Sequence, residues 1–148
     1  MTVIDTFKGD FEFLSNFFPS VIYVNGKRYA TVEHAYQAMK AITNEHHELI
    51  RDAKTPGIAK MLGRSIPVRH DWDEVKISVM RDLVRKKFEN PFLRPLLLAT
   101  EDAMLVEGNY WHDEFWGVYI KTGKGENWLG RILMEIRDEI RKDETVIL

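Results

Sequence analysis

The feature that most constrains the fold of this chain is a long amphipathic segment between residues 73 and 88. Val75, Val79, Leu83 and Phe88 recur along one side of it at helical spacing, with charged residues between them. A helix of this kind must bury its apolar side against other elements. Hydrophobic residues make up 45% of the 148-residue chain, which is enough apolar material for a core.

Further helices are predicted from residue spacing and from start and stop signals. Thr31 is a candidate N-cap for a helix from Val32 to about Thr43, and Thr55-Pro56 opens another that Gly63 stops. The remaining predicted helices span residues 45–53, 90–100 and 127–142. The last of these carries an apolar stripe of Leu129, Leu133, Ile136 and Ile140.

Extended structure is predicted for the first thirty residues. Asn25-Gly26 separates the run 21–24 from the run 27–30, which is a strong signal for a β-hairpin. Residues 104–107 read as a short buried strand, and 108–126 read as a loop. The sequence therefore predicts an α+β fold that is mostly helical, with a small N-terminal β-sheet. We expect one domain spanning residues 1–148.

Composition narrows the classes of function. A net charge of −2 gives no electrostatic case for general nucleic-acid binding, although it leaves room for a local phosphate pocket. The chain has no cysteine, which excludes disulfides, thiolate nucleophiles and cysteine-ligated zinc. No His-Glu-x-x-His spacing occurs, so a metal site has no support in the sequence. We expect no metal and no cofactor. We also expect no signal peptide, no membrane contact and a cytoplasmic location.

The predicted helix after Thr31 carries a polar face. Glu33, Gln37 and Lys40 lie on that face at i, i+4 and i+7, and Tyr36 borders it. One interpretation is an ordinary solvated stripe, with Glu33 favoured by the helix dipole in the first turn. The other is a binding face, since a carboxylate, an amide and an ammonium facing one way can hold a polar ligand.

Two other segments carry unusual aromatic residues. Trp72 lies between two aspartates just before the predicted helix 73–88, where it is either a hydrophobic staple or a stacking surface for a flat base. The segment 107–117 combines large aromatics with a histidine and carboxylates. It is either a site or a loop pinned by its aromatics, with Asp113 as a turn residue. The turn 123–127 is a weak candidate for a phosphate cradle.

Taken together, these segments resemble the NADAR family, also called YbiA-like N-glycosidases. The resemblance runs from Phe13 to about Arg137. It rests on Phe13-Leu14-Ser15-Asn16-Phe17, Thr31-Val32-Glu33-His34-Ala35-Tyr36-Gln37-Ala38, Ala59-Lys60-Met61-Leu62-Gly63-Arg64, Trp72 with Lys76, Lys87-Phe88 with Asn90-Pro91, Leu105-Val106-Glu107, Phe115-Trp116-Gly117 and Gly125-Glu126-Asn127-Trp128-Leu129-Gly130-Arg131-Ile132-Leu133-Met134. The order and spacing of these blocks carry the resemblance.

The resemblance implies a hydrolase that cleaves N-glycosidic bonds. Family members release ribose 5-phosphate from a ribosylamino-pyrimidine of the riboflavin pathway, and others remove ADP-ribose from modified guanine in nucleic acid. We expect the first activity, with the second as the alternative and a non-catalytic module that binds ADP-ribose or nucleotides as a third interpretation. Nucleic acid would then be a partner only as a modified substrate. The sequence sets no oligomeric state.

The resemblance also implies roles for particular residues. The family's functional positions look like Glu33, Trp72 and Asp113. Either carboxylate could activate water while the other stabilises the positive charge that develops on the sugar, and Trp72 could stack on the base. Some relatives carry an aspartate where this chain has Val118. Further candidates for substrate binding are Asn16, Tyr36, Gln37, Lys40, Arg64, Trp116, Gly117, Lys124 and Asn127, of which Lys40, Arg64 and Lys124 are suited to a phosphate.

Overall fold

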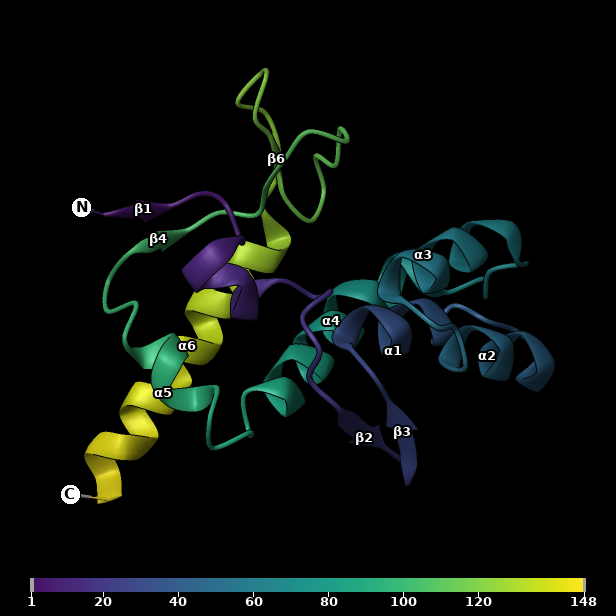
Figure 1. Ribbon diagram of the computed structural model, residues 1–148, viewed down its shortest axis with the longest axis horizontal. Helices are drawn as coiled ribbons and strands as arrows, with labels where there is room; N and C mark the ends of the chain where they lie inside the picture. The colour runs from purple at the N-terminus through teal and green to yellow at the C-terminus, as the bar shows by residue number, and fades with distance from the viewer. Residues whose placement is uncertain (1, 148) are drawn as a thin grey trace. The chain divides into compact units, whose positions relative to one another are not determined.

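The structure is a computed structural model that describes residues 2–147 (Figure 1). The chain forms two compact units. One unit is the continuous segment Asn16–Lys87, and the other combines Met1–Ser15 with Phe88–Leu148. The prediction of a single domain stays a prediction. The prediction of a mostly helical α+β fold is confirmed, because helices dominate both units and the strands are short.

The unit Asn16–Lys87 begins with the predicted hairpin. Strand β2 (Ile22–Val24) pairs antiparallel with β3 (Lys27–Tyr29), so that Ile22 lies opposite Tyr29. Asn25 and Gly26 between them have φ angles of 51° and 79°, the positive values that a tight type I′ turn requires. The Asn-Gly signal therefore predicted this hairpin correctly.

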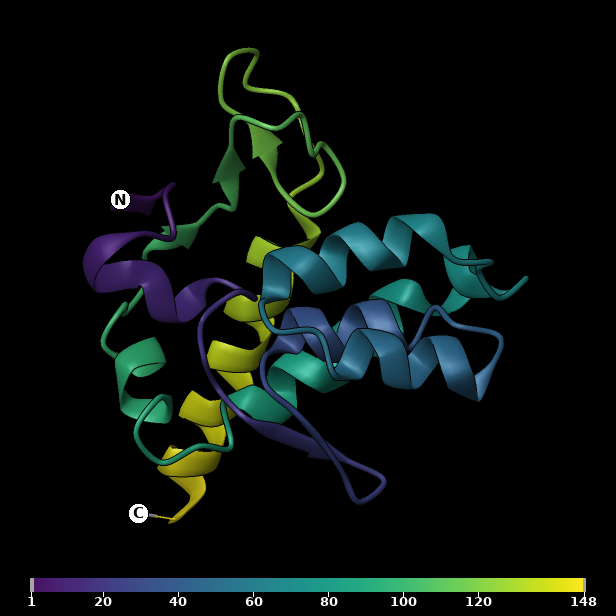
Figure 2. The same cartoon turned by 45° about the vertical axis from the view of Figure 1, so that its right-hand side comes forward.

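Four helices complete this unit. They are α1 (Val32–Ala38), α2 (Asn44–Arg51), α3 (Pro56–Ser65) and α4 (Trp72–Lys87). The first three begin at threonines 31, 43 and 55, whose side chains accept a hydrogen bond from a backbone N–H in the first turn. Helix α1 packs against the other three (Figure 2). Every residue of α1 is buried, including its polar ones.

Helix α1 is shorter than its residue spacing predicted. We expected it to reach about Thr43, but it ends at Ala38. The backbone N–H of Ala41 bonds to the carbonyl of Ala38, and Ala41 then forms a β-bridge with Val68. Thr43 instead caps the next helix. Ile42, which we expected on the apolar side of this helix, is 57% exposed.

Two α-helices of the other unit lie side by side, α5 (Arg94–Leu98) and α6 (Trp128–Ile147) (Figure 1). The predicted stripe Leu129, Leu133, Ile136 and Ile140 of α6 is buried. Helix α5 is shorter than the predicted span 90–100, because residues 90–93 form turns in which the amide of Phe92 bonds to the side chain of Asn90.

Short strands join distant parts of this unit. Strand β1 (Val3–Ile4) pairs parallel with β4 (Met104–Leu105), and β5 (Gly108–Asn109) pairs parallel with β6 (Val118–Tyr119). The strand predicted at 104–107 is present as Met104–Leu105, but the span 108–126, which we read as a loop, also holds β5 and β6. The prediction that the first thirty residues are extended was wrong at Gly9–Leu14, which form the 3₁₀ helix η1 and bury Phe13 and Leu14.

Candidate functional site

Glu33 lies in the first turn of α1 and is buried, with 7% of its surface exposed. Its backbone N–H donates to the carbonyl oxygen of Asn16 at 3.1 Å, which satisfies one of the free amides at the helix N-terminus. The Asn16 side chain donates to the sulfur of Met80 at 3.4 Å. The interpretation of this helix face as a solvated stripe is thus wrong for Glu33. A carboxylate is rarely buried unless it is paired or functional.

Gln37 lies one turn further along α1 and contacts Glu33 directly. Its Nε2 donates to Oε1 of Glu33 at 2.8 Å, and 4% of the Gln37 surface is exposed. The other end of the amide, Oε1, is buried without a hydrogen-bond partner among the described residues. It lies against Gly63 of α3, where an added Cβ would come within 2.0 Å of it. A buried acceptor without a donor costs about 1–3 kcal/mol.

Tyr36, also on α1, and Trp72, at the start of α4, form an aromatic pair. Their ring centroids are 5.1 Å apart with an interplanar angle of 52°, and both residues are buried. The contact follows from the end of α1, since the amide of Arg69 bonds to the carbonyl of Lys40 and the amide of Trp72 to the carbonyl of Arg69. Trp72 therefore packs onto Tyr36 of α1. The staple interpretation, which placed Trp72 against the helix that follows it, stays a prediction. A stacking role toward a base stays a prediction.

Lys40 follows the end of α1, and its Nζ lies 5.6 Å from the centre of the Tyr36 ring. Burial lowers the pKa of Lys40, and the nearby cations Arg64, Lys60 and Lys76 lower it further, while Glu33 opposes this effect. The ammonium of Lys76 also pairs with Asp73 at 3.1 Å. Three cations of α3 and α4 therefore act on Lys40, and four positive charges grouped in this way favour an anionic ligand there.

Sequence reasoning named Lys40 and Arg64 but missed Lys60 and Lys76 as members of this group. A signal was present, because Lys60 and Arg64 are four residues apart on α3, and Trp72 and Lys76 are four apart on α4. Residues at i and i+4 share a helix face. Only the packing of α3 and α4 on α1 shows that the two faces meet beside Lys40.

His34, next to Glu33 in the sequence, has a structural role. Its Nδ1 lies 2.8 Å from the hydroxyl oxygen of Thr31, and its Nε2 lies 2.8 Å from the carbonyl oxygen of Ala53. Since a carbonyl oxygen only accepts, Nε2 carries the proton in this bond. The imidazole ring thus joins the start of α1 to the segment after α2, and it is 1% exposed.

Asp113 lies in the other unit, in the loop between β5 and β6. Its Oδ1 accepts hydrogen bonds from the backbone amides of Phe115 at 3.0 Å and Trp116 at 2.9 Å. Its own amide donates to Oδ1 of Asn109 at 2.9 Å, and the Asn109 side chain donates to the Asp113 carbonyl at 2.9 Å. These contacts match the interpretation of Asp113 as a turn residue. A catalytic role for Asp113 stays a prediction.

Asn127 and Gly117, two other predicted residues of this unit, contact the segment around Glu107 that precedes this loop. The side chain of Asn127 accepts from the amide of Glu107 and donates to the carbonyl of Leu105, both at 3.0 Å, so its amide group holds the chain after β4. A Cβ on Gly117 would lie 2.0 Å from the carbonyl oxygen of Glu107. The Trp116 ring packs edge-on against Phe115, and Lys124 is exposed.

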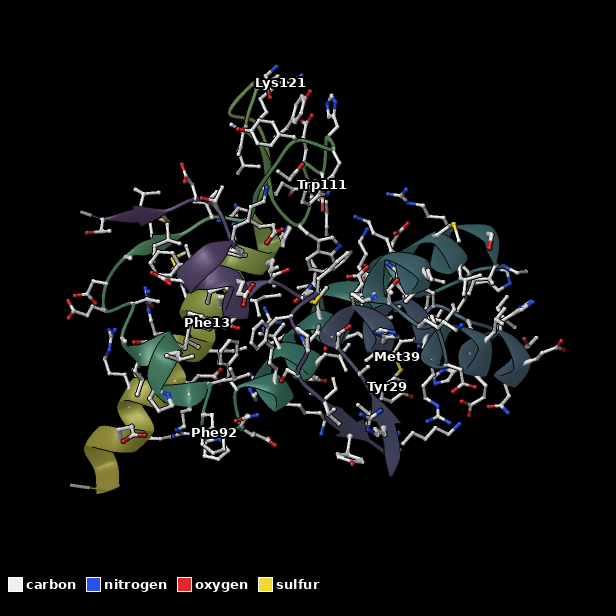
Figure 3. All side chains as sticks on the ribbon, in the orientation of Figure 1. Phe13, Tyr29, Met39, Phe92, Trp111 and Lys121 are labelled. Atoms are coloured by element: carbon white, nitrogen blue, oxygen red, sulfur yellow. The ribbon has the colours of Figure 1, made fainter. Side chains whose placement is uncertain are left out.

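The tip of this unit carries exposed aromatic residues. Tyr110 and Trp111 are 59% and 54% exposed, and Figure 3 shows Trp111 and Lys121 on the segment that links β5 to α6. His112 stacks on the ring of Tyr119 with centroids 4.2 Å apart and pairs with Glu114. The backbone of His112 has a φ of 67°, a strained value for a residue other than glycine.

The predicted site residues thus fall into two groups, one in each unit. Asn16, Glu33, Tyr36, Gln37, Lys40, Arg64 and Trp72 belong to the unit Asn16–Lys87, and Asp113, Trp116, Gly117, Lys124 and Asn127 belong to the other unit. Across residues 2–147, no group of three or more histidine or acidic side chains is arranged to hold a metal ion. None of the described helices combines the length and the apolar character needed to cross a membrane.

The buried carboxylate, the aromatic pair and the cations all lie within the part of the chain that matches a known protein family. Residues 5–141 match the NADAR domain. The chain belongs to the NADAR domain family, so the family prediction is confirmed.

Named relatives support this assignment. The N-glycosidase YbiA of Escherichia coli is 44% identical over 135 residues, which cover 89% of this chain and 81% of that protein. An N-glycosidase of Nostoc punctiforme is 44% identical over 86% of this chain and 84% of its own length. The chloroplastic riboflavin biosynthesis protein PYRR of Zea mays is 40% identical over 85% of this chain, which corresponds to 23% of that longer protein.

A solved structure shows the same fold. The NMR structure of YbiA from Escherichia coli matches with a TM-score of 0.86 and 40% sequence identity, covering 97% of this chain and 88% of that one.

Proposed function

We propose that this protein hydrolyses the C–N glycosidic bond of a phosphoribosylamino-pyrimidine of the riboflavin-intermediate type, releasing ribose 5-phosphate and the free base. One observation carries the proposal: the buried carboxylate of Glu33 and the cations Arg64, Lys60 and Lys76 all act on Lys40, in the same unit as an aromatic pair. This arrangement supplies a group for the sugar and a group for the phosphate.

The reaction class rests on family and relatives. The chain is an enzyme, a hydrolase of N-glycosyl bonds, because relatives that share 44% identity over most of their own length are N-glycosidases. The substrate is the part that we propose. Its support is that two other relatives, from Vibrio vulnificus and Zea mays, are named riboflavin biosynthesis proteins.

The chemistry assigns a direct role to Glu33. As the C1′–N bond breaks, its electron pair goes to nitrogen and positive charge develops on C1′ and the ring oxygen. A carboxylate close to that face stabilises the charge and takes a proton from the attacking water. The hydroxide adds to C1′, and the proton ends on the released nitrogen. The products are ribose 5-phosphate and the free amino-pyrimidine, with one water consumed.

The cations suit the phosphate end of the substrate. A phosphate monoester carries up to two negative charges, and a group of lysine and arginine side chains binds it through charge-assisted hydrogen bonds. Lys40 is held near Glu33 and Tyr36, so it links the phosphate end to the carboxylate. Two roles stay predictions from the family resemblance: Trp72 as a stacking surface for the base and Asp113 as a second carboxylate. A cytoplasmic location stays a prediction from the sequence.

The proposal is tested by measuring product release from two substrates side by side. One is a ribosylamino-pyrimidine phosphate, and the other is an oligonucleotide that carries an ADP-ribosyl guanine. Glu33→Gln is the control, because it keeps the size of the side chain and one oxygen that can accept from Gln37, while removing the charge.

We expect turnover of the first substrate by the wild type and a loss of about 10²–10⁴-fold in Glu33→Gln. Turnover of the oligonucleotide alone would replace the proposed substrate with an ADP-ribosylated base. If the folded wild type cleaves neither substrate but binds one of them, the protein is a binding module and the proposed activity is wrong.

A further inference from the structure

We infer that Gln37, seated against Gly63, is a positioning residue that holds the carboxylate of Glu33 in its working orientation. The inference rests on the proposed function, since it assigns Gln37 a role through Glu33. It differs from the sequence prediction, in which Gln37 was a candidate to contact the substrate. The contacts of both ends of the Gln37 amide carry the argument.

The hydrogen bond fixes which way the amide of Gln37 faces. An ionised carboxylate only accepts hydrogen bonds, so the group that faces Oε1 of Glu33 at 2.8 Å must be the NH₂ of Gln37. A donor on this oxygen restricts rotation of the carboxylate and favours its charged form. Both side chains are nine-tenths buried or more, so bulk water does not compete strongly for the bond.

The other end of the amide gives the second observation. Facing NH₂ toward Glu33 leaves Oε1 of Gln37 buried without a donor among the described residues. A methionine would fill the same space without burying an unpaired oxygen, so Gln37 is a poor choice for stability alone. A glutamine with one unpaired end makes sense at this position if its NH₂ is needed as a hydrogen-bond donor to Glu33.

Gly63 makes this arrangement possible. A Cβ at position 63 would lie 2.0 Å from Oε1 and 2.8 Å from Cδ of Gln37. Both distances are far inside van der Waals contact, so any larger residue at 63 must displace the amide. Gly63 lies inside α3, where glycine costs helix stability relative to alanine. Its presence in the helix thus fits a requirement for space next to Gln37.

Four variants test the inference on the 148-residue chain. Gln37→Met removes the donor and keeps the volume, and Gly63→Ala keeps the donor and removes its space. Gln37→Ala, alone and combined with Gly63→Ala, completes a double-mutant cycle. The matched control is Gly57→Ala in the same helix, because a Cβ there meets only Oγ1 of Thr55 at 3.8 Å. Circular dichroism and thermal melting check that each variant folds.

We expect Gln37→Met and Gly63→Ala to lower kcat by roughly ten- to a hundredfold with little change in KM, because a carboxylate that is slightly misplaced slows the chemical step. The acid limb of the pH–rate profile should move to higher pH in Gln37→Met, because its carboxylate has lost a donor that favours the charged form. Gly57→Ala should match the wild type. Gly63→Ala should have little further effect once Gln37 is alanine.

Other outcomes would overturn the inference in distinguishable ways. A rise in KM at unchanged kcat in Gln37→Met would mean that Gln37 binds substrate instead. Wild-type kinetics and an unmoved acid limb in Gln37→Met, with Glu33→Gln inactive, would reject the inference and leave the proposed function intact. If Gly63→Ala does not fold, Gln37→Met alone decides. A wild type without turnover would remove the proposed function and this inference together.

Discussion

At the scale of single residues, the two carboxylates predicted to act in catalysis have different surroundings. Glu33 is buried in a helix and accepts a hydrogen bond from the side chain of Gln37. Asp113 is half-buried in a loop, and its Oδ1 accepts from two backbone amides. Glu33 is thus tied to a side chain of its own helix, whereas Asp113 is tied to the backbone of its own loop.

We predict that Asp113→Asn and Asp113→Ala separate a structural from a catalytic role for this residue. The Oδ1 of asparagine can still accept from the amides of Phe115 and Trp116, whereas alanine cannot. Alanine should lower the free energy of unfolding by about 1–3 kcal/mol, and asparagine by much less, as measured by urea unfolding. Activity then decides the catalytic question. If Asp113→Asn is stable but inactive, the reaction requires the negative charge of Asp113. If its activity is near normal, Asp113 has only its role in the turn.

We predict that Lys60→Met raises KM for a phosphorylated substrate, although sequence reasoning did not single out this residue. Removing one of the cations around Lys40 should raise KM by about tenfold or more, as expected for a lost hydrogen bond to a charged group. It should change kcat much less. Steady-state kinetics at low salt measures both constants, with the exposed Lys54→Met as the control. An equal effect of both variants would mean that general surface charge, and not this group of cations, attracts the substrate.

At the scale of elements, local signals predicted where most helices and the hairpin begin. The threonine caps, the proline at the start of α3 and the Asn-Gly turn act through bonds and torsions within a few residues, so they can be read from the sequence. The end of α1 could not be read in this way. It ends at Ala38 because Ala41 pairs with Val68, a partner 27 positions away in the printed sequence.

We predict that Gly26→Ala weakens the hairpin of β2 and β3. A φ of 79° is costly for a residue with a Cβ, so alanine should lower the free energy of unfolding by roughly 1 kcal/mol. For a chain of this length the melting temperature should fall by about 2–4 °C. The comparison is Gly57→Ala, which lies in a helix, where alanine is favoured. If both variants melt alike, the turn conformation does not limit stability.

At the scale of the whole molecule, stability should depend on pH through groups at the packing of α2 on the hairpin. Burial lowers the pKa of His47, whose Nε2 lies 2.7 Å from the hydroxyl of Tyr29. The hydrogen bonds from Lys27 and Arg51 lower the pKa of Glu48 to about 2. Both groups bind protons less readily in the folded than in the unfolded protein.

We predict that the free energy of unfolding falls as the pH is lowered below about 6.5, where the unfolded histidine begins to bind a proton that the folded one resists. The contribution of Glu48 is fully present above its ordinary pKa and is lost as the pH falls toward 2. Urea unfolding between pH 7.5 and 5 measures the first effect. His47→Gln should flatten the curve in this range more than His46→Gln does. Equal slopes in the two variants would assign the pH dependence to another group.

The sequence by itself determined the local elements, the α+β class and the family, because helix periodicity, caps, turn residues and motif order are all short-range or linear features. It also placed Glu33 and Gln37 on one helix face, whereas Lys40, predicted on the same face, lies beyond the end of α1 at Ala38. Tertiary structure decided that Glu33 and Gln37 are buried, because burial depends on α2, α3 and α4 packing around α1.

Tertiary structure also decided which residues join that face from other elements. Lys60, Lys76 and Gly63 become part of the site only when α3 and α4 pack beside α1. The sequence left Asp113 as either a catalytic group or a turn residue. In the structure its side chain accepts hydrogen bonds from the backbone amides of Phe115 and Trp116, as a turn residue does. The physical reason is the same in each case. Contacts between residues far apart in the chain depend on how the elements pack, which no local pattern in the sequence specifies.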